Sequence, residues 1–140
     1  MNPILIKGNC YQDFRGDLKY NNNFDASGVK RIYIIENQKL GFKRGWQGHK
    51  IEQRWFSVIN GSFKIMLIEV DDWENPNSNL EPIIFNLDSQ TFDVLHTPSG
   101  YITCIEALEE NSKLLVLADY LLGELDDEYK FALDFFNCTK

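Results

Sequence analysis

Short runs of β-branched and aromatic residues, separated by turn residues, dominate the pattern of apolar and polar positions in this chain. Such runs predict β-strands, because branched and aromatic side chains suit a pleated, half-buried surface. They occur at 29–35, 54–59, 62–68, 83–85, 92–96, 101–105 and 113–117. Asn60-Gly61 separates two of them and predicts a tight hairpin, whose two turn positions need positive φ. The series as a whole predicts an all-β sandwich or barrel.

The C-terminal segment departs from this pattern. After Gly123, Asp126 or Asp127 is placed to cap a helix that extends to Phe136, and acidic residues are favourable in a first helical turn. We therefore expect a short C-terminal helix. With 140 residues, the chain is long enough to bury its own core, and we expect one domain over 1–140.

Charge is distributed unevenly along the chain. The net charge of -7 argues against nucleic acid as a partner. Residues 106–134 alone carry -7, whereas residues 30–64 hold eight basic and two acidic residues, a local charge of +6. The basic stretch is either a binding face for a small anion or a set of surface lysines paired with the acidic segment. The charge pattern fits both interpretations.

Cysteine usage and the apolar runs indicate the compartment. The three cysteines, Cys10, Cys104 and Cys138, are far apart in the sequence and form no CxxC pair. The N-terminus lacks a basic stretch followed by an apolar run, so no secretory signal is visible. No apolar run reaches the ~18 residues of a membrane helix. These features predict a cytoplasmic protein with reduced thiols and no membrane partner.

Most of the candidate chemistry lies in residues 44–55. Gln47 and His49 are two residues apart, so on a strand their side chains share a face. Together with Pro98-Ser99-Gly100, this stretch resembles the two motifs of the cupin superfamily. The positions at which cupins carry metal ligands are here Gln47, His49, Arg54 and Thr103. His49 is the one usual ligand that remains, and a metal site needs three or four converging donors, so we expect no metal.

A set of shorter motifs narrows the resemblance. In chain order they are Asp13-Phe14-Arg15-Gly16-Asp17-Leu18, Val29-Lys30-Arg31-Ile32-Tyr33, Arg44-Gly45, His49-Lys50, Glu52-Gln53, Gly61-Ser62-Phe63, Leu115-Val116-Leu117-Ala118-Asp119 and Asp126-Asp127-Glu128-Tyr129. Together they are similar to the WxcM-like group of sugar-nucleotide 3,4-ketoisomerases, relatives of the dTDP-4-keto-rhamnose 3,5-epimerases. The resemblance covers nearly the whole chain. It implies a homodimeric cupin jelly roll that moves protons on a dTDP-linked 4-keto-6-deoxy sugar, without metal or organic cofactor, in surface polysaccharide biosynthesis.

Isomerisation of this kind needs a base that removes a proton next to a carbonyl, and donors that stabilise the enediolate. Histidine titrates near neutral pH, tyrosine and arginine can donate to an enediolate, and arginine also binds pyrophosphate. The candidate catalytic residues are His49, Tyr33 and His96. The candidate substrate-binding residues are Arg44, Gln47, Arg54, Arg31 and Tyr101.

One departure from the pattern of the group leaves the activity open. The isomerases carry Arg-Gly-x-His-x-His, whereas Gln47 stands here at the first histidine, a position that by resemblance carries protons. Glutamine cannot titrate, so any catalysis depends on His49 with Tyr33, Tyr101 or His96. The alternative is a catalytically silent cupin that binds a nucleotide sugar. A metal-dependent cupin dioxygenase is disfavoured by the number of ligands.

Overall fold

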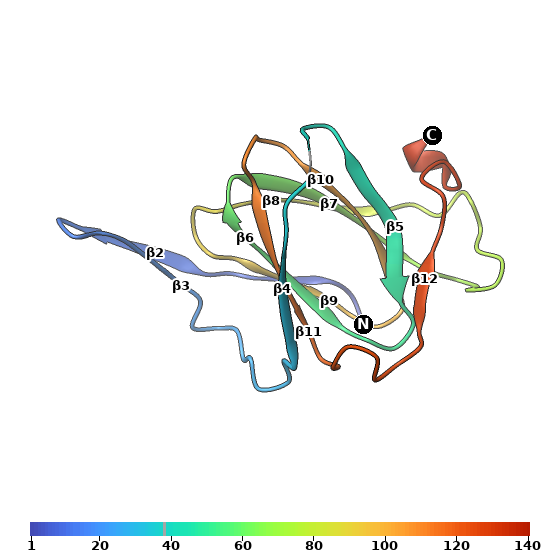
Figure 1. The fold of residues 1–140 in the computed structure, drawn as a ribbon, viewed down its shortest axis with the longest axis horizontal. Helices are drawn as coiled ribbons and strands as arrows, with labels where there is room; N and C mark the ends of the chain where they lie inside the picture. The colour runs from blue at the N-terminus through green and yellow to red at the C-terminus, as the bar shows by residue number, and fades with distance from the viewer. Residues whose placement is uncertain (38) are drawn as a thin grey trace.

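The computed structural model describes residues 1–37 and 39–140 as two antiparallel sheets that pack face to face, with a projecting hairpin (Figure 1). The strands are β1 (Ile4–Ile6), β2 (Asn9–Asp13), β3 (Gly16–Tyr20), β4 (Arg31–Ile35), β5 (Lys43–His49), β6 (Arg54–Asn60), β7 (Ser62–Glu69), β8 (Ile83–Asp88), β9 (Val94–Thr97), β10 (Tyr101–Ala107), β11 (Lys113–Ala118) and β12 (Glu128–Lys130). The first sheet has the order β1-β9-β6-β11-β4, and the second sheet has the order β12-β5-β10-β7-β8. The prediction of an all-β sandwich is confirmed.

The core lies between the two sheets, and alternation along each strand fills it. The first sheet contributes Phe56, Val58, Leu95, Leu114 and Val116, and the second contributes Phe63, Ile65, Leu67 and Ile105. These side chains are almost fully buried, and burying one of them contributes about 1.5–3 kcal/mol. The strands expected from the apolar runs are present with slightly different bounds.

The predicted hairpin at Asn60-Gly61 is wrong. β6 and β7 follow directly on each other, but β6 lies in the first sheet and β7 in the second. Gly61 takes a φ of 76°, which glycine adopts readily, and the chain passes from one sheet to the other. The amide of Ser62 donates to the Ser112 hydroxyl at 3.2 Å at this corner. The two strands thus place their apolar residues in the shared core from opposite sides, which pairing within one sheet would prevent.

The predicted C-terminal helix is also wrong. Residues 128–130 form β12, an edge strand that pairs with β5 in a register that places Glu128 opposite His49. This pairing satisfies an edge of β5 that a helix would leave open. The helical element of this segment is a 3-10 turn, η1 (Asn137–Thr139). Among the described residues, no helix is long and apolar enough to cross a membrane.

Aromatic residues after β12 hold the tail against the outer face of the second sheet. Phe131 and Phe136 pack around Trp46, whose indole N–H donates to Thr139 Oγ1 at 2.9 Å. The rings of Phe136 and Trp46 meet edge-on, with centroids 5.4 Å apart. Along one edge, β5 pairs with β10. The two backbones lie so close at Gly48 that a Cβ there would overlap the β10 backbone. The end of β5 is therefore held by the aromatic tail on its outer face and by β10 along its edge.

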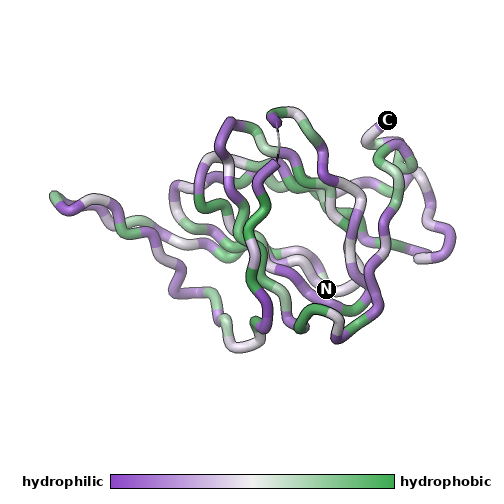
Figure 2. The backbone as a smooth tube through the Cα atoms, viewed as in Figure 1, coloured by the Kyte–Doolittle hydropathy of each residue, from purple (hydrophilic) through white to green (hydrophobic). Residues whose placement is uncertain are grey.

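A hairpin of β2 and β3 projects from the body of the molecule (Figure 1). Hydrophilic and hydrophobic stretches alternate along it (Figure 2). Its apolar side chains are exposed, with Tyr11 at 54%, Leu18 at 61% and Phe14, in the turn, at 98%. At the tip, the hydrogen bonds from Arg15 hold the pKa of Asp13 below its usual value. The hairpin therefore presents apolar surface away from the core.

The outer face of the first sheet is apolar as well. Its exposed isoleucines are Ile4, Ile32, Ile34 and Ile59, with exposed fractions between 41% and 66%. In β4, Ile32 and Ile34 point outward because Tyr33 and Ile35 point into the core. These side chains are spread over β1, β6 and β4, from one edge of the sheet to the other.

Candidate active site

The candidate site lies at one end of the sandwich, where strands of both sheets begin or end. His49 is the last residue of β5 and Tyr101 the first residue of β10, in the second sheet. Arg54 is the first residue of β6, in the first sheet, and Tyr33 lies in β4. Alternation along the strands points these side chains into the space between the sheets. Residues that are far apart in the sequence therefore meet at this end.

His49 forms a buried pair with Asp127, which directly precedes β12. Nδ1 of His49 lies 2.9 Å from Oδ1 of Asp127. The other carboxylate oxygen, Oδ2, accepts the backbone N–H groups of Ile51 at 2.9 Å and Glu52 at 2.8 Å. Burial alone raises the pKa of Asp127, but the hydrogen bonds from His49 and the two amides outweigh it, so the pKa lies below its ordinary value. Asp127 is therefore an ionised acceptor that holds the proton of His49 on Nδ1.

The Arg54 guanidinium lies at the centre of the site and joins its other side chains. Its Nη2 donates to His49 Nε2. Its Nε and Nη2 are each 2.9 Å from Glu52 Oε2, and its Nη1 donates to the Tyr33 hydroxyl at 2.6 Å. Because arginine has donors and no acceptor, His49 Nε2 must accept. His49 therefore carries its lone pair on Nε2, toward the site, as a general base requires.

Arg31 adds a second cation beside the same buried acid. Its Nη2 is 4.0 Å from Glu52 Oε2. The ring of Tyr33 lies between the two arginines, with its centroid 5.1 Å from the Arg31 guanidinium carbon and 5.8 Å from that of Arg54. Nε of Arg31 is buried without a hydrogen-bond partner among the described residues. This N–H is a donor that a bound ligand could satisfy.

Gln47 and Glu128 lie beside His49 at the mouth of the site. Nε2 of Gln47 donates to Oε2 of Glu128 at 3.0 Å, and the same oxygen is 3.9 Å from His49 Nε2. The Glu128 side chain is 41% exposed, whereas the side chains of Glu52 and Asp127 are each 6% exposed. Sequence reasoning did not select these three acids. The available signal was their presence in two of the motifs that carry the family resemblance.

Two small adjoining cavities lie within this group of side chains. One, of about 40 Å³, is lined by Tyr33, Ile35, Arg44, Gln47, Arg54, Phe56, Thr103 and Ile105. The other, of about 10 Å³, includes His49, Glu52 and Tyr101 in its lining. Binding pockets for small molecules usually measure about 300–1,000 Å³. The two cavities are therefore too small to enclose a whole small-molecule ligand.

The structure brings most of the predicted site residues together. Around the two cavities lie His49, Tyr33, Arg31, Arg44, Gln47, Arg54 and Tyr101. Tyr101 is 3% exposed, and its hydroxyl donates to the Met1 carbonyl oxygen at 3.2 Å. Burial, with a smaller effect of the Glu69 charge, raises the pKa of Tyr101. Tyr101 is thus a buried wall of the site.

His96 does not join this group, because it points out of the opposite face of the first sheet. It lies in β9 opposite Trp55 of β6, and the two rings stack with centroids 5.3 Å apart. Nε2 of His96 is 2.7 Å from Oε1 of Gln53, whose backbone and side chain donate to Asp119 at 2.8 and 3.3 Å. Burial lowers the pKa of His96, and the Asp119 charge offsets part of this shift. The predicted catalytic role of His96 does not agree with this position.

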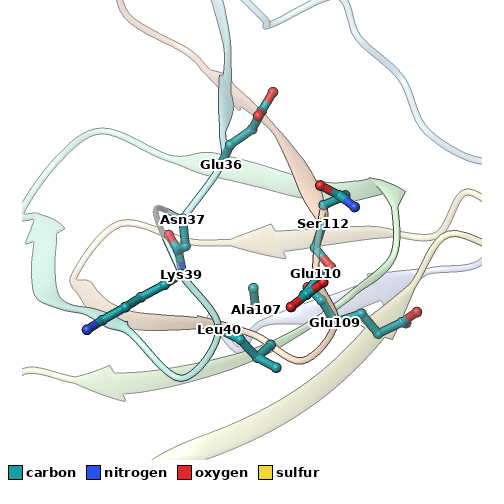
Figure 3. A pocket seen from close by; sticks show the side chains of 9 residues that line it. Glu36, Asn37, Lys39, Leu40, Ala107, Glu109, Glu110 and Ser112 are labelled. Atoms are coloured by element: carbon teal, nitrogen blue, oxygen red, sulfur yellow. Dashed lines mark hydrogen bonds between the residues drawn. The ribbon is translucent and has the colours of Figure 1, made fainter.

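A larger hollow, of about 530 Å³, lies at the other end of the sandwich (Figure 3). It is formed by the segments that follow β4 and β10. Its described lining includes Glu36, Glu109 and Glu110 together with Lys39. Carboxylates repel an anionic ligand, so the end that carries the arginines is the better candidate for binding a phosphorylated compound.

The comparison with solved structures first defines the class of fold. The rmlC epimerase of Mycobacterium tuberculosis matches with a TM-score of 0.70 at 15% sequence identity, over 92% of this chain and 68% of that chain. Two packed antiparallel sheets with a site at one open end are thus a cupin jelly roll of the RmlC-like type. This class is the one that the sequence predicted.

A second comparison, with models of protein families, assigns the chain to one family within this fold. The family model described as WxcM-like, C-terminal matches residues 1–137, and the chain belongs to this family. The QdtA 3,4-ketoisomerase from Thermoanaerobacterium thermosaccharolyticum, solved as a double mutant with TDP, has a TM-score of 0.71 at 26% identity, over 99% of this chain and 94% of that chain. A 3,4-ketoisomerase from Helicobacter canadensis shares the fold, with a TM-score of 0.71 at 22% identity, over 99% and 98%. A search of curated proteins finds no match.

The cupin metal positions do not fit a metal in this chain. Gln47, His49, Arg54 and Thr103 occupy them, and all four lie around the two cavities. The Arg54 cation donates to Nε2 of His49, the nitrogen that would otherwise face a metal ion. Within residues 1–37 and 39–140, no group of three or more His, Cys, Asp or Glu side chains is arranged to hold a metal ion.

Proposed function

We propose that this protein is a sugar-nucleotide isomerase or epimerase that acts by proton transfer on a dTDP-linked 4-keto-6-deoxy sugar. Its family supports this proposal, and so do the solved structures of QdtA, a 3,4-ketoisomerase that has been observed with TDP and, as a mutant, with TDP-4-keto-6-deoxyglucose. The observation that carries the proposal is the buried pair of His49 and Asp127, which directs a basic nitrogen into the site.

A 3,4-isomerisation consists of proton transfers alone. A base removes the proton from C3, the electron pair of that C–H bond forms a C3–C4 double bond, and the C4 carbonyl oxygen becomes an enediolate oxygen that takes up a proton. The 3-hydroxyl group then loses its proton, a carbonyl forms at C3, and C4 receives a proton. C3 is oxidised while C4 is reduced, so the molecule as a whole undergoes no net redox change.

The contacts of the site suggest a role for each residue. His49 is a proton carrier, because Asp127 fixes its tautomer and its Nε2 lone pair points into the site beside Arg54. The Tyr33 hydroxyl accepts a hydrogen bond from Arg54, so its own proton is available to an enediolate oxygen. Arg31 and Arg44 are suited to the diphosphate, which arginine binds through paired donors.

A catalytically silent protein that binds a nucleotide sugar is the second candidate. The observation that favours it is Gln47, which stands at the position of the first histidine of the family pattern and donates to Glu128. An amide cannot carry a proton between substrate atoms. The arginines of the site would then bind the ligand without turnover.

We also propose that the chain acts as one domain, 1–140, and as a cytoplasmic homodimer in surface polysaccharide biosynthesis, with neither a nucleic-acid nor a membrane partner. The apolar outer face of the first sheet and the projecting β2–β3 hairpin support the dimer, because a second copy would cover exposed apolar surface. Light scattering at micromolar concentration is expected to give the mass of a dimer. A monomer mass would contradict the proposal.

Proton exchange with solvent tests the proposed activity. The protein is incubated with TDP-4-keto-6-deoxyglucose in D2O, and NMR follows deuterium at C3 and C5 of the sugar. Exchange at C3 alone indicates a 3,4-ketoisomerase, and exchange at both carbons indicates a 3,5-epimerase. Binding of TDP without exchange at either carbon supports the silent binding protein.

A further inference from the structure

The titratable side chains of the site differ in how many of their nitrogen and oxygen atoms have hydrogen-bond or ion-pair partners. Both ring nitrogens of His49 have partners, Nδ1 with Asp127 and Nε2 with Arg54. Both carboxylate oxygens of Asp127 accept hydrogen bonds, and Oε2 of Glu52 lies 2.9 Å from two nitrogens of Arg54. These two carboxylates are also buried, with 6% of each side chain exposed. Glu52 lines the smaller cavity and its Oε2 is 3.4 Å from His49 Nε2, but the same oxygen is held by Arg54.

Glu128 is placed differently. Its side chain is 41% exposed. Glu128 lies in β12, directly opposite His49 of β5. Its Oε2 accepts from Gln47 Nε2 at 3.0 Å and lies 3.9 Å from His49 Nε2. Its Oε1 is 3.6 Å from the ammonium of Lys130, whose side chain is 71% exposed. The Glu128 carboxylate thus lies beside Gln47, which stands at the position of the first histidine of the family pattern. Its other partner, Lys130, is exposed, so a ligand can displace it.

Building on the isomerase function proposed above, we propose that Glu128 is a second catalytic residue, which carries the proton that Gln47 cannot. Isomerisation moves one proton from C3 to C4 and another from O3 to O4. The Glu128 carboxylate removes the proton from C3 as the C–H electron pair forms the C3–C4 double bond. The resulting carboxylic acid is 41% exposed and exchanges its proton with water before it gives a proton to C4. The reverse step delivers a solvent proton to C3, which is the exchange that D2O reveals. His49 Nε2 transfers the other proton between the two oxygens. Both residues finish in their starting protonation states.

The charges around the site favour this division of roles. Proton abstraction neutralises Glu128 and moves its negative charge onto the sugar oxygens. Those oxygens would lie over Arg54 and the Tyr33 hydroxyl, which are fixed in advance by their mutual hydrogen bond. Preorganised donors of this kind stabilise a developing oxyanion. A carboxylate is also a competent base for a proton next to a carbonyl, as known isomerases show.

Three variants of the full chain test the role of Glu128. Glu128→Gln keeps the size of the side chain and an acceptor for Gln47 but cannot take up a proton, whereas Glu128→Asp keeps a titratable carboxylate. Asp126→Asn removes the same charge from an exposed neighbour. With TDP-4-keto-6-deoxyglucose in D2O, Glu128→Gln is expected to slow deuterium exchange at C3 by about 100- to 10,000-fold, and Asp126→Asn to change it by less than about twofold. Glu128→Asp should exchange faster than Glu128→Gln.

Titration with TDP separates catalysis from binding. The affinity of Glu128→Gln for TDP is expected to match that of the wild type, and a parallel loss of affinity and rate would overturn a catalytic role. Adding Gln47→His to Glu128→Gln restores a titratable group beside the substrate, so the double variant should exchange faster than Glu128→Gln alone. No gain in rate would overturn the assignment of Glu128 to the part of the missing histidine.

The outcomes also separate this inference from the function on which it rests. If the wild type binds TDP but exchanges no proton of the sugar, the isomerase function fails and the role of Glu128 fails with it. If the wild type and Glu128→Gln exchange at similar rates, the isomerase function stands and the role of Glu128 is overturned.

Discussion

The two histidines of this chain lie on opposite sides of the first sheet. His49 faces the inner side of the sheet, where Arg54 donates to its Nε2. His96 projects from the outer side, where its ring stacks on Trp55. Arg54 and Trp55 are consecutive residues of β6, so a single step along one strand separates the two environments.

The two histidines differ mainly in the charged groups that contact their rings. The ring nitrogens of His49 contact Asp127 and Arg54, whose charges are fixed by further hydrogen bonds. His96 contacts the neutral ring of Trp55 and the amide of Gln53, and burial lowers its pKa. A fixed set of opposite charges supports proton transfer, whereas a setting in which burial outweighs the nearest charge, that of Asp119, opposes it. We therefore interpret the inner side as a reactive site and the outer side as a packing surface.

Replacing each histidine by asparagine should separate the two environments most strongly. General acid–base catalysis contributes about 100- to 10,000-fold, so His49→Asn is expected to slow deuterium exchange at C3 of TDP-4-keto-6-deoxyglucose by about that factor. Its affinity for TDP should change little, because the arginines remain. His96→Asn is the matched control and should leave the exchange rate near that of the wild type. Equal losses of rate in the two variants, measured by NMR, would break the comparison.

Arg54→Met is expected to have the next largest effect, this time on stability. Removing one partner of a buried ion pair leaves an uncompensated charge and costs about 3–5 kcal/mol. Arg31 remains 4.0 Å from Glu52, so the lower end of this range, about 3 kcal/mol, is expected. Urea unfolding measures the difference. Adding Glu52→Gln should recover most of the lost stability, and a double variant as unstable as Arg54→Met would exclude the ion pair as the cause.

The sequence predicted the strands better than the connections between them. Strand positions follow from the local alternation of apolar residues, whereas the partner of a strand depends on the position of the core. For this reason the Asn60-Gly61 sequence predicts a hairpin although the chain changes sheets there. The acids near Asp127 predict the start of a helix, but the Asp127 carboxylate instead binds His49 and two backbone amides.

The candidate site was predicted where a family pattern or a strand face marked it, as at His49 and Tyr33. The sequence could not separate His49 from His96, because the register with neighbouring strands decides which face of a strand points inward. Glu52 and Asp127 were not selected, because an acid with a buried partner has the same appearance in a sequence as an acid on the surface. Their roles follow from contacts between residues about 75 positions apart, such as the Glu52 amide and Asp127.

A charged residue on the outer face of the first sheet tests whether this face packs against a second copy of the chain. Ile34→Glu would place a carboxylate in the proposed dimer interface. Burying it without a partner is expected to weaken the dimer by about tenfold or more, which corresponds to about 1.4 kcal/mol. Ile84→Glu is the matched control, because Ile84 is 49% exposed and Ile34 is 51% exposed, but Ile84 lies on β8 of the second sheet. Analytical ultracentrifugation compares the variants, and equal weakening by both would show that the first sheet does not form the interface.

The smallest expected effect is the pH dependence that His96 adds to stability. Burial lowers the pKa of His96 below its ordinary value of 6.5, with a partial offset from Asp119. As the pH falls below 6.5, the unfolded chain therefore binds more protons than the folded chain, and the free energy of unfolding decreases until the lower pKa of the folded state is reached. His96→Gln keeps a neutral hydrogen-bonding side chain and removes this dependence.

Urea unfolding of the wild type and His96→Gln, each followed from neutral pH down to the pH at which carboxylates begin to titrate, measures the contribution of His96. Asp127 does not interfere, because its hydrogen bonds outweigh burial and hold its pKa below 3.8, so its contribution is present above that pH and is lost only below it. The wild type should therefore lose more stability than His96→Gln as the pH falls below 6.5. Equal losses would mean that His96 takes up a proton as readily in the folded chain as in the unfolded chain. The outer side would then tolerate a charge, and the contrast with the His49 side would rest on the reactive groups alone.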